Sequence, residues 1–324
     1  MARNRRRRKD LADNRRSVPF FPAAGPGRHD QADLHMLRED IHHKIIPLGG
    51  RSRRWPDYRA SVVPAGDETS ELILDALALE EREYDMTSAF GAFVRRTVDL
   101  ILHQGEAFYE VVYDREKDPE AFLFAPLPPG EYRVFEGTFT QILPPAVQTA
   151  RGLSRPFVEL PEEDIIRISF PDSLGGKDAV LMLLDAFESM GNSILPGFAG
   201  TDFAGFSREF GLQVGVEYRE MREVALARAT SALGWDTRSL LDGKITQFYR
   251  YHRMLKFSLS MARLREHFLE RLNAALIPPM GRVGIEGSIV VEGLPTAATF
   301  EAKIAELASG ELPFNQVFDL LWMN

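Results

Sequence analysis

The chain of 324 residues contains no cysteine. This excludes disulfide bonds and thiolate-bound metal sites, and it is compatible with a reducing compartment. No apolar run approaches the roughly 18 residues that a membrane span needs, and no apolar segment follows the basic first residues. We therefore expect neither a membrane span nor a secretory signal. An apolar fraction of 44%, with 10% aromatic residues, nevertheless predicts a folded core.

Sequence motifs for catalysis are scarce as well. Gly175-Gly176-Lys177 lacks the upstream glycine and the following hydroxyl residue of a phosphate-binding loop. No nucleophile elbow, zinc-protease helix or calcium-loop motif occurs. His42-His43 has no further ligand at metal-binding spacing. Glu162-Glu163-Asp164 directly precedes an apolar strand pattern, which favours a solvated turn over a Mg²⁺ site. We expect no enzyme activity, no cofactor and no metal.

One enzymatic alternative stays open, a metal-dependent nuclease or another DNA-processing enzyme. Asp172 and Glu301 would supply paired carboxylates for a metal, and Lys303 would approach the scissile phosphate. The pattern is short, its two parts are far apart in the sequence, and Glu301 and Lys303 fall on a predicted helix.

Charge is distributed unevenly along the chain. Residues 1–60 hold 15 basic and 7 acidic residues, which leaves 24 basic and 40 acidic residues in 61–324. A cationic arm is therefore joined to an acidic body. The cluster Arg5, Arg6, Arg7, Arg8 and Lys9 is our candidate for electrostatic contact with nucleic acid. The alternative is a solubilising tail without a binding role.

Hydrophobic periodicity switches between a helical and a strand pattern along the body and predicts an α+β fold. Residues 86–103 repeat apolar side chains every three to four positions, as a helix does. Short β-branched and aromatic runs then follow, separated by Pro/Gly turns. From residue 178 the pattern is helical again, and a long helix over 239–276 is expected to stop at Pro278-Pro279. The predicted short strands are 107–113, 121–126, 132–135, 138–143, 165–170 and 288–291.

The order of these features resembles the portal proteins of tailed bacteriophages. Residues 97–111 (TVDLILHQGEAFYEV) look like that family's helix that ends at a glycine and enters a strand. Residues 122–130 (FLFAPLPPG) are similar to the leucine–proline turn that comes next. Residues 160–168 (LPEEDIIRI) match an acidic pair before a strand, and residues 175–181 (GGKDAVL) match a glycine turn into a helix.

The C-terminal half continues the resemblance. Residues 227–235 with Leu240-Leu241 look like the family's helix, glycine and double leucine. Residues 268–276 (FLERLNAAL) resemble the helix that follows. Residues 306–316 (ELASGELPFNQ) are similar to the closing glycine and Asn-Glu signature, with Gln316 in place of the glutamate. The match covers about residues 65–324, and the family's longer stem and clip insert is reduced to about 40 residues before Gly234.

The resemblance implies a structural protein of the virion, assembled in the host cytoplasm and placed at one capsid vertex. Such subunits form a ring, commonly of twelve copies, through which double-stranded DNA is packaged and ejected. Its implied partners are further copies of itself, the major capsid protein, the large terminase subunit, a head–tail connector or adaptor protein, and the DNA. A portal-derived scaffold with another cargo is a further alternative.

The resemblance also implies how the chain is organised. Residues 1–60 are expected to form a basic, weakly ordered arm. Residues 61–200 are expected to form an α+β module like the portal wing. Residues 201–324 are expected to form a helical module like the stem and crown, with the short strand near 288–291.

Overall fold

The computed structural model describes residues 11, 13–19, 32–47, 57–79, 85–117, 119–192, 228–235, 246–313 and 316–317. The chain divides into two compact units. Unit 1 contains Met1–Ala24, Ile46–Phe170 and Arg265–Leu294, and unit 2 contains Gly25–Ile45, Pro171–Leu264 and Pro295–Asn324. Helices alternate with small antiparallel sheets, which confirms the α+β prediction.

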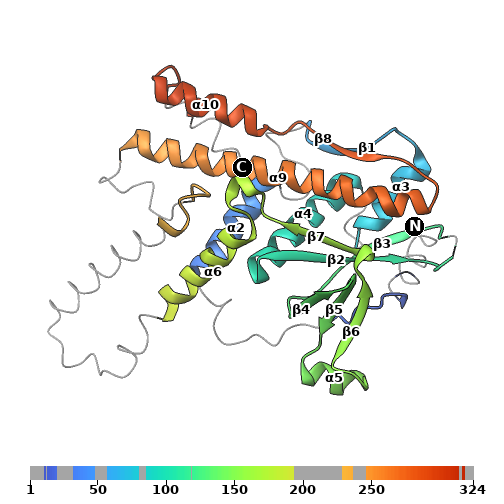
Figure 1. Ribbon diagram of the computed structural model, residues 1–324. Helices are drawn as coiled ribbons and strands as arrows, with labels where there is room; N and C mark the ends of the chain where they lie inside the picture. The colour runs from blue at the N-terminus through green and yellow to red at the C-terminus, as the bar shows by residue number, and fades with distance from the viewer. Residues whose placement is uncertain are drawn as a thin grey trace, which may run out of the picture. The chain divides into compact units, whose positions relative to one another are not determined.

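The central sheet of unit 1, called sheet B, has the strand order β3-β2-β7 (Figure 1). Its strands are β2 (Glu106–Tyr113), β3 (Phe122–Pro126) and β7 (Ile165–Ser169), and all neighbours are antiparallel. Every residue of β2 except the two at its ends is buried. A strand buried on both faces requires a cover on each side of the sheet.

Helices α4 (Met86–Gln104) and α3 (Asp67–Leu77) cover one face of sheet B. The ring of Phe93 on α4 stacks on Tyr109 of β2, with 5.1 Å between centroids. The hydroxyls of Thr97 and Tyr109 share a buried hydrogen bond of 2.7 Å. Apolar residues at helical spacing thus meet alternate residues of the strand, which is the packing that the periodicity predicts.

Local sequence sets both ends of α4. The side chain of Asp85 accepts a hydrogen bond from the backbone N–H of Ser88 at 2.7 Å, and the Ser88 hydroxyl completes a capping box. At the other end Gly105 has φ 85°, a left-handed conformation that glycine adopts without steric cost. Strand β2 begins at the next residue, as the sequence predicts.

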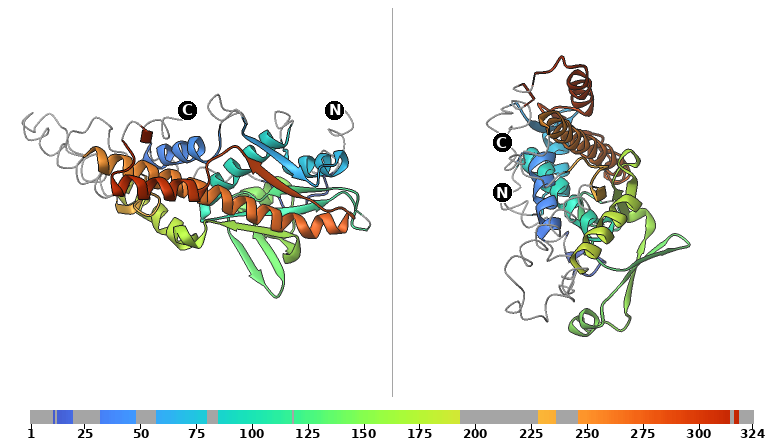
Figure 2. Two further views of the ribbon diagram at one scale, coloured as in Figure 1. Left: turned by 90° about the horizontal axis from the view of Figure 1, so that it is seen from above. Right: turned by 90° about the vertical axis from the view of Figure 1, so that its left-hand side faces the viewer.

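The second sheet of unit 1, called sheet C, projects from sheet B (Figures 1 and 2). It has the order β4-β5-β6, with β4 (Tyr132–Phe135), β5 (Thr138–Ile142) and β6 (Phe157–Pro161). Helix α5 (Pro145–Arg151) connects β5 to β6. The inner face of sheet C packs through Phe139 and Leu160 on Phe108 and Leu127. Neither α5 nor β6 was predicted, because α5 has no buried residue and β6 has only one, so neither carries a clear apolar pattern.

A two-stranded sheet in unit 1 joins segments that are far apart in the sequence. Strand β1 (Arg59–Val63) pairs antiparallel with β8 (Ser288–Glu292). Asn273 supports this pair, since its side chain accepts from the backbone N–H of Ile289 at 2.8 Å and donates to the Ile289 carbonyl at 2.9 Å. The sequence predicted β8 but not β1, which lies at the boundary of the stretch 1–60 that reads as a weakly ordered arm.

Unit 2 contains α2 (Ala32–Ile45), the short turn η3 (Asp172–Leu174), α6 (Gly176–Asn192) and α10 (Ala297–Ser309). The long helix α9 (Gln247–Arg282) begins in unit 2 and ends in unit 1. In unit 2, α9 and α10 share an apolar core with the residues that follow α10. The buried members of this core are Leu255, Leu259, Ala262, Phe300, Leu307, Leu312 and Val317.

The predicted end of the long helix at Pro278-Pro279 is wrong. Both prolines lie inside α9, which continues to Arg282. Proline removes a helical N–H donor but keeps a φ that suits a helix, so contacts made by the last turn can hold it helical. Arg282 supplies such contacts, with its guanidinium 4.9 Å from the Tyr113 ring centroid and 3.4 Å from Asp164. Gly284, at φ 73°, then turns the chain.

Candidate functional site

Leu11 and residues 13–19, called here the N-terminal segment, lie on the side of sheet B opposite α4. Along β2, Phe108, Glu110 and Val112 alternate with Tyr109, which faces α4, so these three side chains point to the other face. Leu11, fully buried, packs in a cluster with Val112 and three residues of the β3 region. Those three residues are Ala121, Leu123 and Ala125. The N-terminal segment therefore supplies part of the second cover that β2 requires.

A buried carboxylate holds the N-terminal segment. Glu110 is 3% exposed. Its two oxygens accept hydrogen bonds from the backbone N–H groups of Arg16 at 2.9 Å and Ser17 at 3.0 Å. Arg15 Nε lies 3.8 Å from Glu110 Oε2, and the Arg15 guanidinium also donates to the carbonyl of Pro126. Burial lowers the pKa of Arg15, and the charge of Glu110 opposes that shift.

Two side-chain amides complete these contacts. Gln141 of β5, 0% exposed, accepts from the backbone N–H of Val18 at 2.9 Å and donates to the Val18 carbonyl at 3.0 Å. Asn14 donates to the carbonyls of Tyr113 at 3.1 Å and Asp114 at 2.8 Å. The N-terminal segment is thus bonded to both sheet B and sheet C.

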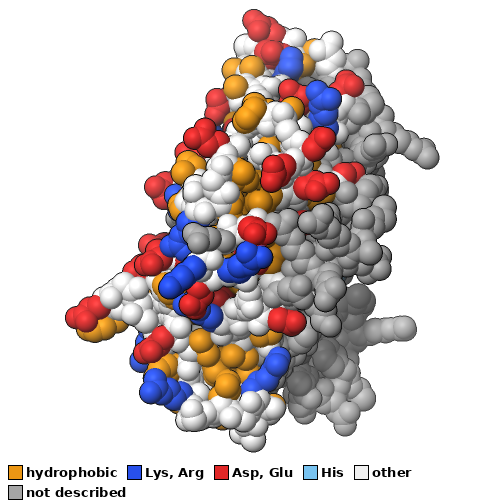
Figure 3. Space-filling model, turned by 90° about the vertical axis from the view of Figure 1, so that its right-hand side faces the viewer, with side chains coloured by type: hydrophobic (Ala, Val, Ile, Leu, Met, Phe, Trp, Pro, Cys, Tyr) orange, Lys and Arg blue, Asp and Glu red, His pale blue; other side chains and the backbone are white. Residues whose placement is uncertain are grey.

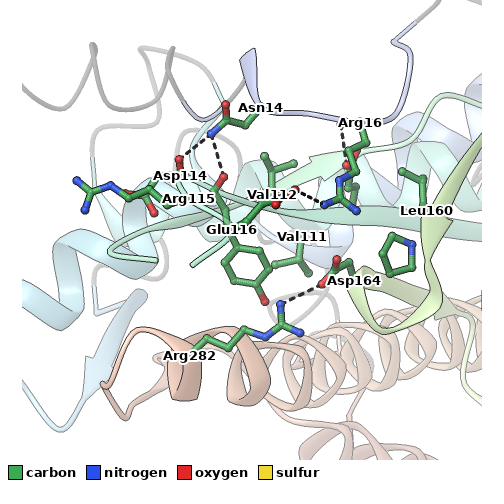
Figure 4. A pocket seen from close by; sticks show the side chains of 13 residues that line it. Asn14, Arg16, Val111, Val112, Asp114, Arg115, Glu116, Leu160, Asp164 and Arg282 are labelled. Carbon is green, nitrogen blue, oxygen red and sulfur yellow. Dashed lines mark hydrogen bonds and ion pairs between the residues drawn. The ribbon is translucent and has the colours of Figure 1, made fainter. Parts of the chain in front are cut away.

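A pocket of about 430 Å³ lies beside the N-terminal segment (Figure 4). Asn14 and Arg16 border it on one side, and Asp164 and Arg282 border it on the other. Its full lining is Asn14, Arg16, Glu110, Val111, Val112, Tyr113, Asp114, Arg115, Glu116, Leu160, Pro161, Asp164 and Arg282. The lining is rich in charged side chains of both signs.

The charges in this pocket pair with one another. Arg282 lies 3.4 Å from Asp164, and Arg16 lies 3.0 Å from Glu116. Asp114 Oδ1 accepts hydrogen bonds from the backbone N–H groups of Glu120 and Ala121, just before β3. Burial raises the pKa of Asp164, while the positive charge of Arg282 acts in the opposite direction. Because these charges already have partners within the protein, we interpret the residues as structural and not as a ligand-binding set.

Two of the three residues considered for a nuclease, Glu301 and Lys303, form ion pairs with other side chains. Glu301 forms an ion pair with Arg263 at 2.7 Å, and Lys303 forms one with Glu306 at 2.7 Å. Asp172 is the first residue of the turn η3, and its backbone carbonyl accepts from the N–H of Gly175 at 2.9 Å. Within the described part of the chain, no group of three or more His, Asp or Glu side chains could hold a metal ion. No observation therefore favours the nuclease alternative.

The predicted nucleic-acid contacts, Arg5 to Lys9, lie outside the described residues. The described surface in Figure 3 shows Lys and Arg side chains among Asp and Glu side chains.

In the ranges that the structure describes, no helix is long and apolar enough to cross a membrane.

The glycines of the portal-like motifs lie at element boundaries. Gly105 ends α4, and Gly175 and Gly176, at φ 87° and 62°, form the turn into α6. Gly234, at φ 80°, packs so closely on α9 that a Cβ there would lie 2.7 Å from the backbone nitrogen of Phe257. A larger residue at position 234 would therefore be strained by its backbone conformation and by this contact.

Trp235, next to Gly234, is buried in unit 2 and is held there by three hydrogen bonds. Its indole N–H donates to Asp40 Oδ2 at 2.7 Å. Its carbonyl accepts from the hydroxyl of Thr230 at 2.9 Å and from the guanidinium of Arg253. Residues 236–245, with Leu240-Leu241, and the Gly/Phe-rich stretch 196–205 lie outside the described residues.

Among the comparisons with known proteins, only the comparison with solved structures gave a match. No protein-family model matches the chain, and no curated protein matches it. Among solved structures, the chain is similar to an HK97 family phage portal protein from Corynebacterium diphtheriae, with a TM-score of 0.42 and 11% sequence identity. The match covers 86% of this chain and 99% of that chain. It agrees with the family that the sequence resembles, but at this TM-score it adds no argument about function.

Proposed function

We propose that the protein is a structural subunit of a portal-like ring at a capsid vertex, through which double-stranded DNA passes. The observation that carries this proposal is the order of portal-like motifs over residues 65–324, together with their positions in the fold. The helix that ends at Gly105 leads directly into β2, and the acidic pair Glu162-Glu163 precedes β7. The glycine turn at residues 175–176 leads into α6.

A closed ring of identical subunits needs two unlike complementary faces on each copy. Helix α9 is our candidate for one of them, with a neighbouring copy as its partner. It has 36 residues, and at about 1.5 Å per residue it spans roughly 54 Å. Ile277, Phe248 and Tyr249 on this helix are 69%, 44% and 39% exposed. In this proposal a neighbouring copy would cover Phe248 and Tyr249 in the first turn of α9 and Ile277 near its end.

The acidic body suits a DNA conduit. Residues 61–324 hold 40 acidic and 24 basic residues. Carboxylates repel phosphates, whereas a basic lining would bind DNA through counterion release. In this proposal the body keeps DNA mobile, and the cluster Arg5–Lys9 makes the electrostatic contact with DNA.

The remaining roles follow from the ring. The partners would be the major capsid protein, the large terminase subunit, a head–tail connector protein and the DNA. The proposed organisation is a basic arm over 1–60, a wing-like module over 61–200 and a stem- and crown-like module over 201–324. Only about 40 residues stand where portals carry stem and clip, so we expect a reduced clip.

Native mass spectrometry and negative-stain imaging of the purified chain at several concentrations test this function. We expect closed rings of about nine to thirteen copies with a central hole. A chain that stays monomeric or dimeric, also in the presence of capsid protein, would contradict the proposal.

A further inference from the structure

The contacts of the N-terminal segment have the form of a peptide bound to a protein surface. Glu110 and Gln141, both buried, direct their polar atoms at the main chain of residues 16–18. An unpartnered carboxylate inside a sheet is costly. Glu110 is compatible with the middle of a buried strand because the N-terminal segment satisfies it.

Side-chain contacts make the site selective. Main-chain hydrogen bonds supply affinity in such complexes, and pockets for individual side chains supply specificity. Here the Arg15 side chain, 15% exposed, reaches Glu110 and the carbonyl of Pro126. Four residues earlier, Leu11 is fully buried in the apolar cluster on β2 and β3. Leu11 and Asn14 are joined by a turn hydrogen bond, so the site fits a segment in which one turn separates an apolar side chain from an arginine four residues later.

We propose that Glu110, Gln141 and the β2–β3 hairpin form a docking site for an arginine-bearing peptide segment. Residues 13–18 of the same chain occupy it, and this docking anchors the basic cluster Arg5–Lys9 to the folded body. The anchoring role rests on the proposed function, in which the cluster contacts DNA. When residues 13–18 are docked, the cluster is tethered close to the folded body, so it loses less conformational freedom on binding DNA than it would if residues 13–18 were undocked.

Trypsin tests the docking in the full-length chain, because Arg15 and Arg16 are cleavage sites within the segment. We expect wild-type cleavage after these two residues to be at least about tenfold slower than in a synthetic peptide of residues 10–20. Mass spectrometry of the fragments over time gives both rates. Equal rates in the protein and the peptide would overturn the docking site, and this comparison needs no variant.

Two variants test the recognising side chains separately. Glu110→Gln removes the negative charge, and Gln141→Leu removes both hydrogen bonds to Val18. Each should speed cleavage after Arg15 and Arg16 by about tenfold, while cleavage after Arg95 and Arg96 of α4 stays slow. The matched control is Glu116→Gln, which removes the exposed partner of Arg16 and should change the rates less than about twofold. Unchanged cleavage in both folded variants would overturn the proposal.

DNA binding tests the anchoring role. A 30-base-pair duplex at several salt concentrations gives both the affinity and the slope of its logarithm against that of salt. We expect Glu110→Gln to bind about three- to tenfold more weakly with an unchanged slope, because the same cations are involved. Deletion of residues 2–9 should weaken binding and also lower the slope. Equal affinity of wild type and Glu110→Gln would overturn the anchoring.

The two failures can be told apart. If the chain forms no ring, the proposed function fails, but slow cleavage after Arg15 and Arg16 would still support the docking site. If the chain forms rings and these two sites are cleaved as fast as in the peptide, the docking fails and the proposed function stands.

Discussion

Sheets B and C of unit 1 are both three-stranded and antiparallel, but they are covered differently. Sheet B has α3 and α4 on one face and the N-terminal segment on the other, and its strand β2 is buried along six of eight residues. In sheet C, three of the four residues of β4 are exposed. The difference shows that a substitution on β2 should act on folding, whereas the effect of a substitution in sheet C should depend on which face it changes.

The largest effect is expected from Glu110→Ala in sheet B. The substitution leaves Arg15 without its carboxylate and two backbone N–H groups without an acceptor. Removing one partner of a buried ion pair costs about 3–5 kcal/mol of the free energy of unfolding. Urea denaturation measures it. A loss no greater than that of Glu116→Ala, whose side chain is 87% exposed, would contradict the account of the N-terminal segment.

The inner face of sheet C should be nearly as sensitive. Phe139 is 1% exposed, and its ring lies 5.2 Å from those of Phe108 and Tyr132. Phe139→Ala should lower the free energy of unfolding by about 3–4 kcal/mol through a cavity, as measured by denaturation with urea. A loss below about 1 kcal/mol would show that sheet C contributes little to the core.

High pH should act through sheet B. Burial raises the pKa of Tyr109 to about 12, from 10.0. Because the folded state keeps this proton more strongly, the stability is fully present below pH 10 and is lost as the pH rises through about 12. The contribution of one such tyrosine is about 2–3 kcal/mol.

Thermal unfolding from pH 8 to 12 measures this loss. Tyr109→Phe should flatten the alkaline decrease in Tm only in part, because burial also raises the pKa of Tyr58 to about 12. An identical pH profile in Tyr109→Phe and wild type would contradict the assignment.

The smallest effect is expected at the tip of sheet C. Phe135 lies at the turn between β4 and β5 and is 72% exposed. Phe135→Ala should change the free energy of unfolding by less than about 0.5 kcal/mol, in contrast with Phe139→Ala. Denaturation midpoints of the two variants give the comparison directly, and a loss above about 1 kcal/mol would show that Phe135 is covered.

The elements that the sequence predicted are those with strong local signals. Helix α4 has an apolar stripe, a capping box and a terminal glycine, and β2 follows it with aromatic and β-branched residues. Strand β1 was not predicted because it lies at the boundary of the stretch 1–60 that reads as a weakly ordered arm, and its partner β8 is more than 220 residues away. The sequence placed the end of the long helix at Pro278-Pro279, whereas α9 continues to Arg282. The contact of Arg282 with the Tyr113 ring is long-range, so the local effect of proline on a helix could not predict it.

The docking of the N-terminal segment could not be predicted either. Residues 11–19 read as part of a basic, Pro- and Gly-rich arm, and their contacts are with strands about 100 residues later. One signal was present in the sequence: Glu110 stands within the otherwise apolar and aromatic run Phe108 to Tyr113. A carboxylate at a position that a strand buries requires a donor from elsewhere in the chain.

The most direct test of the central claim is the assembly state of the purified full-length chain, measured by native mass spectrometry with negative-stain imaging. The account predicts a single ring species of about nine to thirteen copies around a central hole. Particles that are only monomers or dimers over the whole concentration range, with or without capsid protein, would contradict it.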